Sequence, residues 1–460
     1  MNFDKRFPAS GRRSGTHPRG TIQPLIQRAQ EVAGLAGVLL FALCWSLGPA
    51  APGIGLVLFT LAFLSRLPRL GALLREPVVL WALCLAAYLG LRTALGLGEH
   101  RFDREVLTDG FKDWLWLLLF VPFAYWLADN RRRVYWVLGL GLGGFLAGML
   151  GSVNWTHLAA FLGRRTGFHL PVISFSLYCS TALLALLVLA PRLWGLGSGS
   201  AGPAQRAARL LLWFLALALL TQGLIQAQSR GTWLAFGLVA PVLLLLRYWR
   251  SLTMLESRRL LWVAMAGVLL FATLLAFNSD LIRQRLAAEK DTVAAIVAGG
   301  LDSAPKSSIS YRLYLWRFAV GKWAQHPLLG WGPGSTETLI AESGREELYQ
   351  TRNMGYLDHL HNTYLETLLQ LGVLGAFLWL GLLAALVQGL WRAHRAGVLP
   401  RDMLLWYLGF LVLTAIWSLF DFRLLHYDWR YFWILVAGSG YSYCLHAAGI
   451  GPRQGLRDGS

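Results

Sequence analysis

The sequence predicts an all-α, polytopic integral membrane protein with about 12 transmembrane helices and one long helical loop between the ninth and the tenth. Hydrophobic residues make up 56% of the chain and charged residues only 14%, whereas a soluble domain carries about 25% charged residues. Apolar runs follow one another along the chain, each long enough to cross a bilayer, which takes about 20 residues. A polar stretch from Asn278 to His361 interrupts them.

The expected spans are these runs in chain order: 30–47, 51–67, 77–95, 112–128, 134–151, 172–191, 208–227, 231–249, 259–277, 367–391, 403–420 and 429–447. Merging 30–67 or splitting 367–391 would change the count. The chain then divides into a basic tail expected to be disordered (1–29), spans one to nine (30–277), the long loop (278–361), spans ten to twelve (362–447) and a C-terminal tail (448–460).

The placement of charge predicts the orientation of these spans. The net charge of +18 first suggests a nucleic-acid partner. If the N-terminus is cytoplasmic and the spans alternate, however, the cytoplasmic segments hold more than half of the 42 Lys and Arg residues and nearly all of the net charge. That is the positive-inside pattern, so we expect both termini in the cytoplasm, the long loop outside and no nucleic acid. Binding of nucleic acid or anionic lipid is the weaker alternative.

The long loop contains its own predicted elements. Apolar and aromatic residues, Trp316 among them, recur at helical spacing from Ser310 to Trp323 and predict an amphipathic helix. Gly330-Trp-Gly-Pro-Gly334 predicts a tight turn, and Glu337–Tyr349 a second short helix.

Two arginines are candidates for an anion site. Arg230, in Ser229-Arg230-Gly231, sits at the external edge of a span and at the start of the next predicted helix, whose free N–H groups favour anions. Arg312 lies in the predicted loop helix. Two guanidinium groups at one apolar surface can clamp a diphosphate. The alternatives are that Arg230 snorkels to lipid headgroups and that Arg312 is an ordinary solvated charge.

No metal or other cofactor is expected. The external side has no Asp-x-Asp, and Glu289-Lys-Asp291 is only a weak substitute. The arginines must then carry the charge of any anionic leaving group. The four cysteines fall within predicted spans without metal-ligand spacing, so we expect them to pack as small apolar residues.

His361 is the candidate general base. Thr363 and Glu366 fit a capping box, which places His361 just outside a helix N-terminus. The positive end of a helix lowers the pKa of an imidazole and keeps it neutral, as a base requires. We expect the side chain of His359 to point away from that of His361. The alternative is that His361 and Asn362 only satisfy backbone groups of the loop.

Between the last two spans, Asp421 with Arg423 and Asp428 with Arg430 are expected to form exposed ion pairs that contribute little stability. Arg423 is retained as a possible extra contact to a substrate.

Taken together, the residues Ser229-Arg230-Gly231, Arg312 in Tyr-Arg-x-x-x-Trp, Gly330-Trp-Gly-Pro-Gly334 and His361-Asn362-x-Tyr364-Leu-Glu366 resemble the membrane O-antigen ligase family. The resemblance extends to the related O-antigen polymerases and O-linking oligosaccharyltransferases, and covers about residues 208–440.

The resemblance implies a metal-independent, inverting glycosyltransferase in the bacterial inner membrane, active on its periplasmic face in lipopolysaccharide biosynthesis. The donor would be a glycan on undecaprenyl diphosphate and the acceptor lipid A–core oligosaccharide, with membrane lipids around the protein. By analogy, Arg230 and Arg312 hold the diphosphate while His361 accepts the proton of the acceptor. Further substrate contacts would come from Ser229, Trp316, Gly332, Gly334, His359, Asn362, Tyr364 and Arg423.

Three alternatives remain open at this stage. A polymerase or an O-linking oligosaccharyltransferase would use the same donor, and the residues do not separate these enzymes. A polysaccharide transporter or flippase is the weaker alternative, because transporters place charges at mid-span and show internal repeats. The glycan, the acceptor sugar, the oligomeric state and the role of the first six spans are left undetermined.

Overall fold

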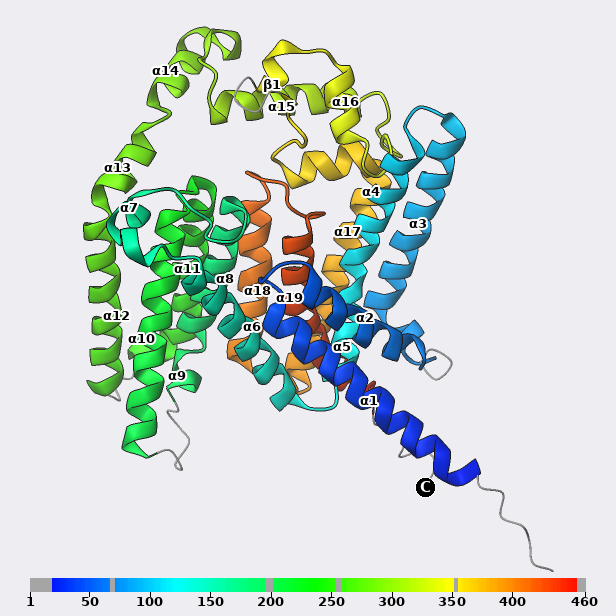
Figure 1. Cartoon of the computed structure of the whole chain (residues 1–460), viewed down its shortest axis with the longest axis vertical. Coiled ribbons are helices and arrows are strands. Elements are labelled where there is room, and N and C mark those ends of the chain that lie inside the picture. The colour runs from blue at the N-terminus through cyan, green and yellow to red at the C-terminus, as the bar shows by residue number, and fades with distance from the viewer. Residues whose placement is uncertain (1–18, 67–70, 195–201, 254–257, 351–354, 453–460) are drawn as a thin grey trace, which may run out of the picture.

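The computed structural model describes residues 19–66, 71–194, 202–253, 258–350 and 355–452 (Figure 1). Its helices are α1 (Arg19–Cys44), α2 (Ala50–Leu64), α3 (Pro77–Glu99), α4 (Arg104–Trp116), α5 (Phe120–Leu127), α6 (Arg131–Gly151), α7 (Leu158–Gly163), α8 (Val172–Val188), α9 (Ala190–Leu193), α10 (Pro203–Gln226), α11 (Arg230–Thr253), α12 (Arg258–Phe277), α13 (Ser279–Ala287), α14 (Lys290–Gly299), α15 (Ser308–Trp323), α16 (Thr336–Glu342), α17 (Thr363–Arg395), α18 (Arg401–Trp417) and α19 (Tyr427–Ala447).

Short 3-10 turns join several of these helices: η2 (Leu73–Arg75), η3 (Leu117–Leu119), η4 (Trp155–His157), η5 (Leu301–Ser303) and η6 (Glu346–Leu348). The strands β1 (Tyr349–Gln350) and β2 (Gly355–Tyr356) form a small antiparallel pair in which Tyr349 faces Tyr356. Apart from this pair, the regular structure of the described chain is helical, so the all-α part of the predicted fold class is confirmed.

Within the described residues, the predicted apolar runs lie on single helices, except that 112–128 falls on the succession α4, η3 and α5 and 172–191 on α8 and α9. Among the described residues, 6 helices are long and apolar enough to cross a membrane on their own. Helix α12 with α13 and α14 would make a further span, bent by 62°, while α2 and α8 are shorter apolar helices. The membrane character of the chain is therefore confirmed, and the count of about 12 spans stays a prediction.

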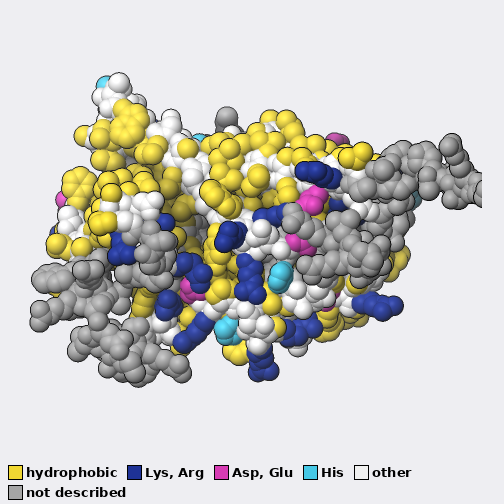
Figure 2. All heavy atoms as spheres, turned by 90° about the horizontal axis from the view of Figure 1, so that it is seen from below, with side chains coloured by type: hydrophobic (Ala, Val, Ile, Leu, Met, Phe, Trp, Pro, Cys, Tyr) yellow, Lys and Arg dark blue, Asp and Glu magenta, His cyan; other side chains and the backbone are white. Residues whose placement is uncertain are grey.

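Most helices run up and down one bundle, and α15 and α16 lie across its upper end (Figure 1). We call this upper side the loop end. The described chain starts and stops at the opposite end, where Figure 2 shows Lys and Arg side chains gathered between apolar surfaces. This arrangement agrees with the alternation of spans that the sequence predicts, although the side of the membrane that each end faces stays a prediction.

Helix α19 forms the centre of the bundle, where almost every residue from Trp429 to Leu445 is buried. Its indole ring at Trp433 stacks on that of Trp429 and packs edge-on against Phe120 of α5. Such aromatic pairs add roughly 0.5–1.5 kcal/mol each beyond the area they bury. A rigid centre of this kind fixes the ends of α17, α18 and α19 relative to one another.

A second, smaller core lies at the loop end and organises residues 301–361, which we call the cap. Leu315 and Phe318 of α15 are buried against Leu339 of α16, Leu360 and Leu369. The predicted loop helix is confirmed as α15, and Ser307 caps it by accepting hydrogen bonds from Ile309 N and Ser310 N. The predicted helix over 337–349 is shorter than expected, because Gly344 (φ +60°) separates α16 from η6.

The glycine turn of the cap completes a break in α17. Gly372 has φ +62° and interrupts the helix, which would leave backbone groups unpaired on either side. The amides of Trp331 and Gly332 donate to the carbonyls of Leu369 and Gln370 at 2.9 and 2.8 Å, while Val373 N donates to Pro327 O at 2.9 Å. The predicted tight turn is thus confirmed, and its backbone joins the cap to a transmembrane helix.

Candidate functional site

The start of α17 is capped differently from the prediction. Asn362 is the N-cap, and its side-chain oxygen accepts hydrogen bonds from Tyr364 N and Leu365 N. Thr363 instead donates its hydroxyl to Asp421 O, and Glu366 is buried, accepting from Leu360 N at 2.9 Å. The capping box of Thr363 and Glu366 was therefore wrong, because both side chains are recruited by tertiary contacts.

Two histidines and an aspartate meet above this helix start. His361 adopts φ +48°, in the left-handed region, and this turns its ring back toward His359. His359 Nε2 lies 3.1 Å from His361 Nδ1, and His361 Nδ1 lies 2.9 Å from Asp421 Oδ1. The expectation that the two histidine side chains point apart was wrong, because it assumed an ordinary extended backbone at His361.

Of the two exposed ion pairs expected between α18 and α19, that of Asp421 with Arg423 forms but is buried, and that of Asp428 with Arg430 was wrong. Asp421 is completely buried, and its second oxygen lies 3.7 Å from Arg423 Nε. Asp428 is buried as well and accepts hydrogen bonds from Ser174 at 2.5 Å and Tyr178 at 2.9 Å. Arg430 pairs with Asp113. The loop folds inward, as the bond from Thr363 N to Ser418 O shows. Asp428 and Arg430, which follow it, find their partners on other helices.

The burial and the neighbouring charges of His359 and His361 set the protonation state of each imidazole ring. Burial lowers the pKa of His361, and the neighbouring charges of His359 and Arg312 lower it further against the opposing effect of Asp421. Burial also acts to lower the pKa of His359, but hydrogen bonds to Asp358 and Asp421 outweigh it and raise that pKa to about 9. Near neutral pH, His361 is neutral beside a cationic His359 and an anionic Asp421. The direction expected for His361 is confirmed, but burial is the main cause.

His361 Nδ1 lies within hydrogen-bond distance of both Asp421 and His359. In the tautomer whose Nδ1–H donates to Asp421, Nε2 carries the lone pair. Within the described chain, Nε2 of His361 has no hydrogen-bond partner, and the side chain is 21% exposed. A buried carboxylate that orients an imidazole in this way is the arrangement by which histidine acts as a general base.

In the part of the chain that the structure describes, His359, His361 and Asp421 are also the group whose side chains could bind a metal ion. His359 Nε2, His361 Nδ1 and one carboxylate oxygen of Asp421 lie within 4.8 Å of one another. Two imidazoles and a carboxylate are a donor set that Zn²⁺ accepts. Here these atoms are already within hydrogen-bond distance of one another, and an ion would have to replace those bonds.

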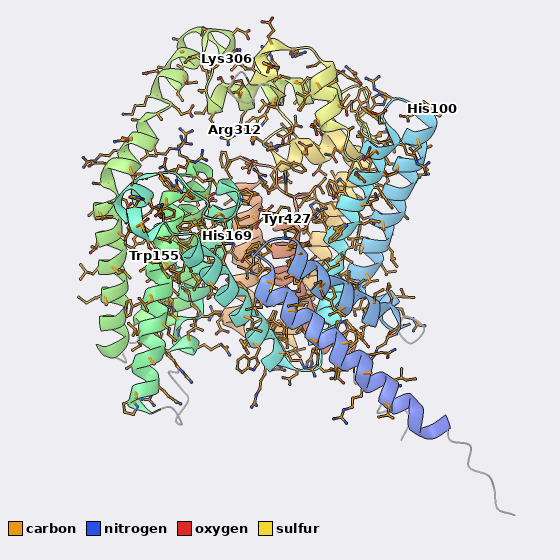
Figure 3. All side chains as sticks on the ribbon, in the orientation of Figure 1. His100, Trp155, His169, Lys306, Arg312 and Tyr427 are labelled. Carbon is orange, nitrogen blue, oxygen red and sulfur yellow. The ribbon has the colours of Figure 1, made fainter. Side chains whose placement is uncertain are left out.

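The two candidate arginines have contrasting surroundings. Arg230 begins α11 as predicted, and its Nη2 lies 2.7 Å from Glu289 Oε1. Arg312 lies on the side of α15 that faces the bundle (Figure 3), and its buried Nε has no hydrogen-bond partner among the described residues. Burial lowers the pKa of Arg312, with Asp421 and Arg230 the strongest charges acting on it. Arg312 is therefore within electrostatic range of both Arg230 and the carboxylate that contacts His361.

The structure gathers most of the remaining predicted site residues around this centre. Trp316 Nε1 donates to Leu360 O at 3.2 Å, and Arg423 lies beside Asp421. Ser229 hydrogen-bonds to Thr232 at 2.8 Å next to Arg230. Tyr364 points elsewhere and donates its hydroxyl to Ala415 O at 2.8 Å.

Gly332 and Gly334 are not part of this centre. A side chain at Gly332 would meet Leu107 of α4, and one at Gly334 would meet the carbonyl of Val106. Their place against α4 and α17 accounts for these glycines by close packing.

Sequence reasoning missed Asp421 as the partner of His361, and it named Glu289 only as a weak metal ligand. It also passed over Arg165 and Arg285, which lie near Arg230. The signal for Asp421 was its location in a loop that the sequence predicts to be external. The signal for Arg165 was the Arg164-Arg165 doublet in another loop predicted to be external.

A scan against family models finds one described as O-Antigen ligase, which matches residues 214–380. Residues 214–380 are thus similar to the O-antigen ligase family, which supports assigning the chain to it. The matched segment includes Arg230, Arg312 and His361, whereas Asp421 lies beyond it. None of the curated proteins compared matches the chain. The O-antigen ligase segment thus supplies both arginines and the imidazole, and the last loop supplies the carboxylate.

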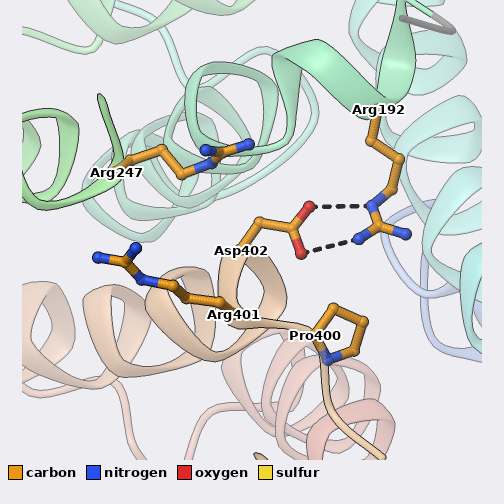
Figure 4. A pocket seen from close by; sticks show the side chains of 5 residues that line it. All are labelled: Arg192, Arg247, Pro400, Arg401 and Asp402. Atoms are coloured by element: carbon orange, nitrogen blue, oxygen red, sulfur yellow. Dashed lines mark hydrogen bonds and ion pairs between the residues drawn. The ribbon is translucent and has the colours of Figure 1, made fainter. Parts of the chain in front are cut away.

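A separate polar cavity of about 230 Å³ lies at the other end of α11, among Arg192, Arg247, Arg401 and Asp402 (Figure 4). Arg192 holds both oxygens of Asp402, at 2.8 and 3.0 Å. Arg247 and Arg401 donate to backbone carbonyls. The one acid in this cavity is already paired, so the cavity offers no proton acceptor, and we place no chemistry there.

Proposed function

We propose that this protein is an O-antigen ligase that transfers a glycan from undecaprenyl diphosphate to lipid A–core oligosaccharide at the periplasmic face of the inner membrane. The observation that carries this proposal is Arg312, a guanidinium whose buried Nε has no partner in the described structure, next to the pair His361 and Asp421. A polar group buried without a hydrogen-bond partner is costly, so it is retained where an anionic ligand completes it.

In the proposed reaction, Nε2 of His361 accepts the proton of the acceptor hydroxyl while Asp421 holds Nδ1–H. The hydroxyl oxygen attacks the anomeric carbon from the side opposite the diphosphate. The bond between that carbon and the phosphate oxygen breaks, its electron pair stays on the diphosphate, and the configuration inverts. Asp421 then stabilises the imidazolium until its proton passes to solvent.

The arginines act on the leaving group. Charge grows on the diphosphate as the bond breaks, and guanidinium groups fixed in advance stabilise that charge without reorganising. Arg230 uses only one of its five donors on Glu289, so most of its hydrogen-bonding capacity is available to a phosphate. Because Arg230 and Arg312 share the leaving-group charge, the mechanism needs no metal ion.

A cell-free assay tests this function. Purified protein in nanodiscs receives a lipid-linked glycan and lipid A–core, and the products are separated by mass. Glycan joined to lipid A–core supports the ligase, while a lengthened lipid-linked glycan indicates a polymerase, which shares the donor and the family. Glycan joined to a protein acceptor would indicate an O-linking oligosaccharyltransferase. Movement of lipid-linked glycan across the bilayer without any transfer would support a transporter instead.

The proposed location is tested separately with introduced cysteines. Asp302 lies in the cap and is 77% exposed at its side chain, and Arg206 is exposed near the start of α10. In intact spheroplasts, Asp302→Cys should react with a membrane-impermeant thiol reagent and Arg206→Cys should not. The reverse pattern would invert the topology and exclude a periplasmic site.

A further inference from the structure

We infer that the cavity between α7 and α13 holds the lipid end of the donor, with Arg165 and Arg285 binding the phosphate nearer the lipid and the cavity walls binding the polyprenyl chain. This inference rests on the proposed function and assigns the part of the donor that the reacting centre does not touch.

The cavity has the shape and chemistry for an amphipathic lipid. It encloses about 850 Å³. Leu158 and Leu162 of α7 line one wall, and Phe277 and Leu281 line the other, while Gln228 and Arg285 lie at the polar part. Phe277 is 72% exposed and Leu158 is 39% exposed. Large apolar side chains exposed at the rim of a cavity, in a protein surrounded by lipid, form an entrance for a hydrocarbon chain from the bilayer.

The two arginines are fixed to one turn beside Arg230. Arg165 Nε donates to Ala227 O at 3.1 Å, and Arg285 Nε donates to Gln228 O at 3.0 Å. Both carbonyls belong to the turn between α10 and α11, which leads directly into Arg230. Each guanidinium is therefore held by its Nε. Its terminal nitrogens have no hydrogen-bond partner among the described residues.

These arginines form one cationic group with the pair at the reacting centre. Burial lowers the pKa of Arg165, and repulsion by Arg312 and then Arg230 lowers it further. Arg285 is within electrostatic range of Arg230 and Arg165. Glu289 and Asp421 are the acids among the strongest charges acting on this group, and both are already engaged, by Arg230 and by His361. Asp280 also lines the cavity, so the four guanidinium groups outnumber the three nearby carboxylates and favour an anion such as a diphosphate.

The apolar walls decide which diphosphate is bound. A free diphosphate or a nucleotide would gain nothing from the leucines beside Arg285. An ordinary phospholipid would fit the walls, but it presents a single phosphate. An isoprenoid diphosphate alone uses both halves of the site, because its chain fills the apolar cavity and its two phosphates reach from Arg285 and Arg165 to Arg230 and Arg312.

The test measures binding to the full-length protein in nanodiscs made of a zwitterionic phospholipid. The probes are undecaprenyl diphosphate, farnesyl diphosphate and inorganic diphosphate. Arg165→Gln and Arg285→Gln should each weaken undecaprenyl diphosphate binding roughly tenfold, the value of one hydrogen bond to a charged group. Arg164→Gln and Arg283→Gln are matched controls, since these exposed neighbours do not donate to the turn that leads into Arg230, and they should bind as the wild type does.

Filling the cavity tests its apolar part. Leu281→Trp should weaken undecaprenyl diphosphate binding and leave inorganic diphosphate binding unchanged, and Leu162→Trp should do the same from the other wall. Circular dichroism and gel filtration confirm that each variant folds. Equal binding of the three probes to the wild type, or competition by excess phosphatidylglycerol, would overturn the assignment of the cavity.

The test of the lipid cavity and the test of the transfer reaction can fail independently of each other. If the wild type binds undecaprenyl diphosphate in the cavity but transfers no glycan to any acceptor, the reaction is wrong and the lipid site stands. If transfer proceeds and is indifferent to Arg165→Gln, Arg285→Gln and Leu281→Trp, the reaction stands and this inference fails.

Discussion

His361 Nδ1 lies 2.9 Å from Asp421 Oδ1, although the two residues are 60 positions apart in the chain. Two further bonds hold their loops together, from Asn362 Nδ2 to Leu419 O at 3.2 Å and from the Thr363 hydroxyl to Asp421 O at 2.9 Å. The helix cap of α17 and the carboxylate that orients the imidazole therefore belong to one hydrogen-bonded network. The proposed base gains its orientation from the same contacts that close the loop end of the bundle.

The first prediction concerns that carboxylate. Asp421→Asn keeps the size of the side chain but removes the charge that fixes Nδ1–H and stabilises the imidazolium. The rate constant for glycan transfer should fall by about 10²–10⁴-fold, while the dissociation constant for undecaprenyl diphosphate should change little. Single-turnover kinetics and a binding isotherm measure the two quantities. Loss of binding together with turnover would instead assign Asp421 to the structure of the loop.

The second prediction concerns pH. A general base works only when neutral, so the rate should fall as pH drops through the pKa of His361, which lies below its ordinary value of 6.5. Because Asp421 acts to raise that pKa, Asp421→Asn should move the acid limb to lower pH still. His361→Ala should remove the limb along with the activity. If the wild-type rate falls to half of its maximum at a pH above 6.5 as the solution is acidified, the lowered pKa is contradicted.

The raised pKa of His359 predicts that the stability of the fold decreases as pH rises, whereas the transfer rate decreases as pH falls. Its protonated form is favoured in the folded state, so its stabilisation is complete below about pH 6.5 and is lost as pH rises through about 9. Thermal unfolding of the wild type should show this loss between those limits. His359→Gln should flatten the curve there, with His326→Gln on the exposed turn before the glycines as the control.

The third prediction contrasts the two arginines. Arg312→Met removes a charge without a hydrogen-bond partner, so it should abolish transfer and leave the free energy of unfolding unchanged or raised by about 1–3 kcal/mol. Arg230→Met should abolish transfer and destabilise, because it leaves Glu289 buried without its cation. Arg230→Lys and Arg312→Lys keep the charge but lose the fork, and should retain little activity. Normal turnover in both lysine variants would instead support the alternative in which the arginine side chains only extend to the lipid headgroups and bind no diphosphate.

The fourth prediction concerns metals. Because the proposed mechanism places the leaving-group charge on Arg230 and Arg312, activity should survive dialysis against a strong chelator. Elemental analysis of the active protein checks that no ion remains. Activity that is lost and then restored by Zn²⁺ would show that His359, His361 and Asp421 hold an ion, and His361 could then no longer serve as the base.

The fifth prediction concerns the break in α17. Alanine at Gly372 would carry a Cβ against the carbonyl of Leu328, in a backbone conformation that costs L-residues about 1–2 kcal/mol. Gly372→Ala should therefore lower the thermal unfolding temperature and reduce transfer. Gly321→Ala in α15, where a methyl group meets open space, is the matched control. Equal stability of the two variants would mean that the break is not required.

Much of this site was accessible from the sequence, because Arg230, Arg312 and His361 are polar residues at the edges of apolar runs. The periodicity of α15 and the glycine turn depend on neighbours in the chain and were predicted for the same reason. Asp421 was misjudged, since its burial is produced by the inward fold of a loop far along the chain. The contact of His359 with His361 depends on one left-handed residue, which a pattern of residue types does not encode.

The cap is attached to the bundle in two physically different ways. Next to Gly372 the attachment consists of backbone hydrogen bonds between the glycine turn and α17. On the other flank, Glu289 joins Arg230 of α11 to Ile309 N at the start of α15 through its charged carboxylate. Salt and acid weaken the second attachment and spare the first. As salt rises or pH falls, the cap should therefore loosen in a fixed order. Its α15 edge should separate from the bundle while its α17 edge is still held by backbone hydrogen bonds.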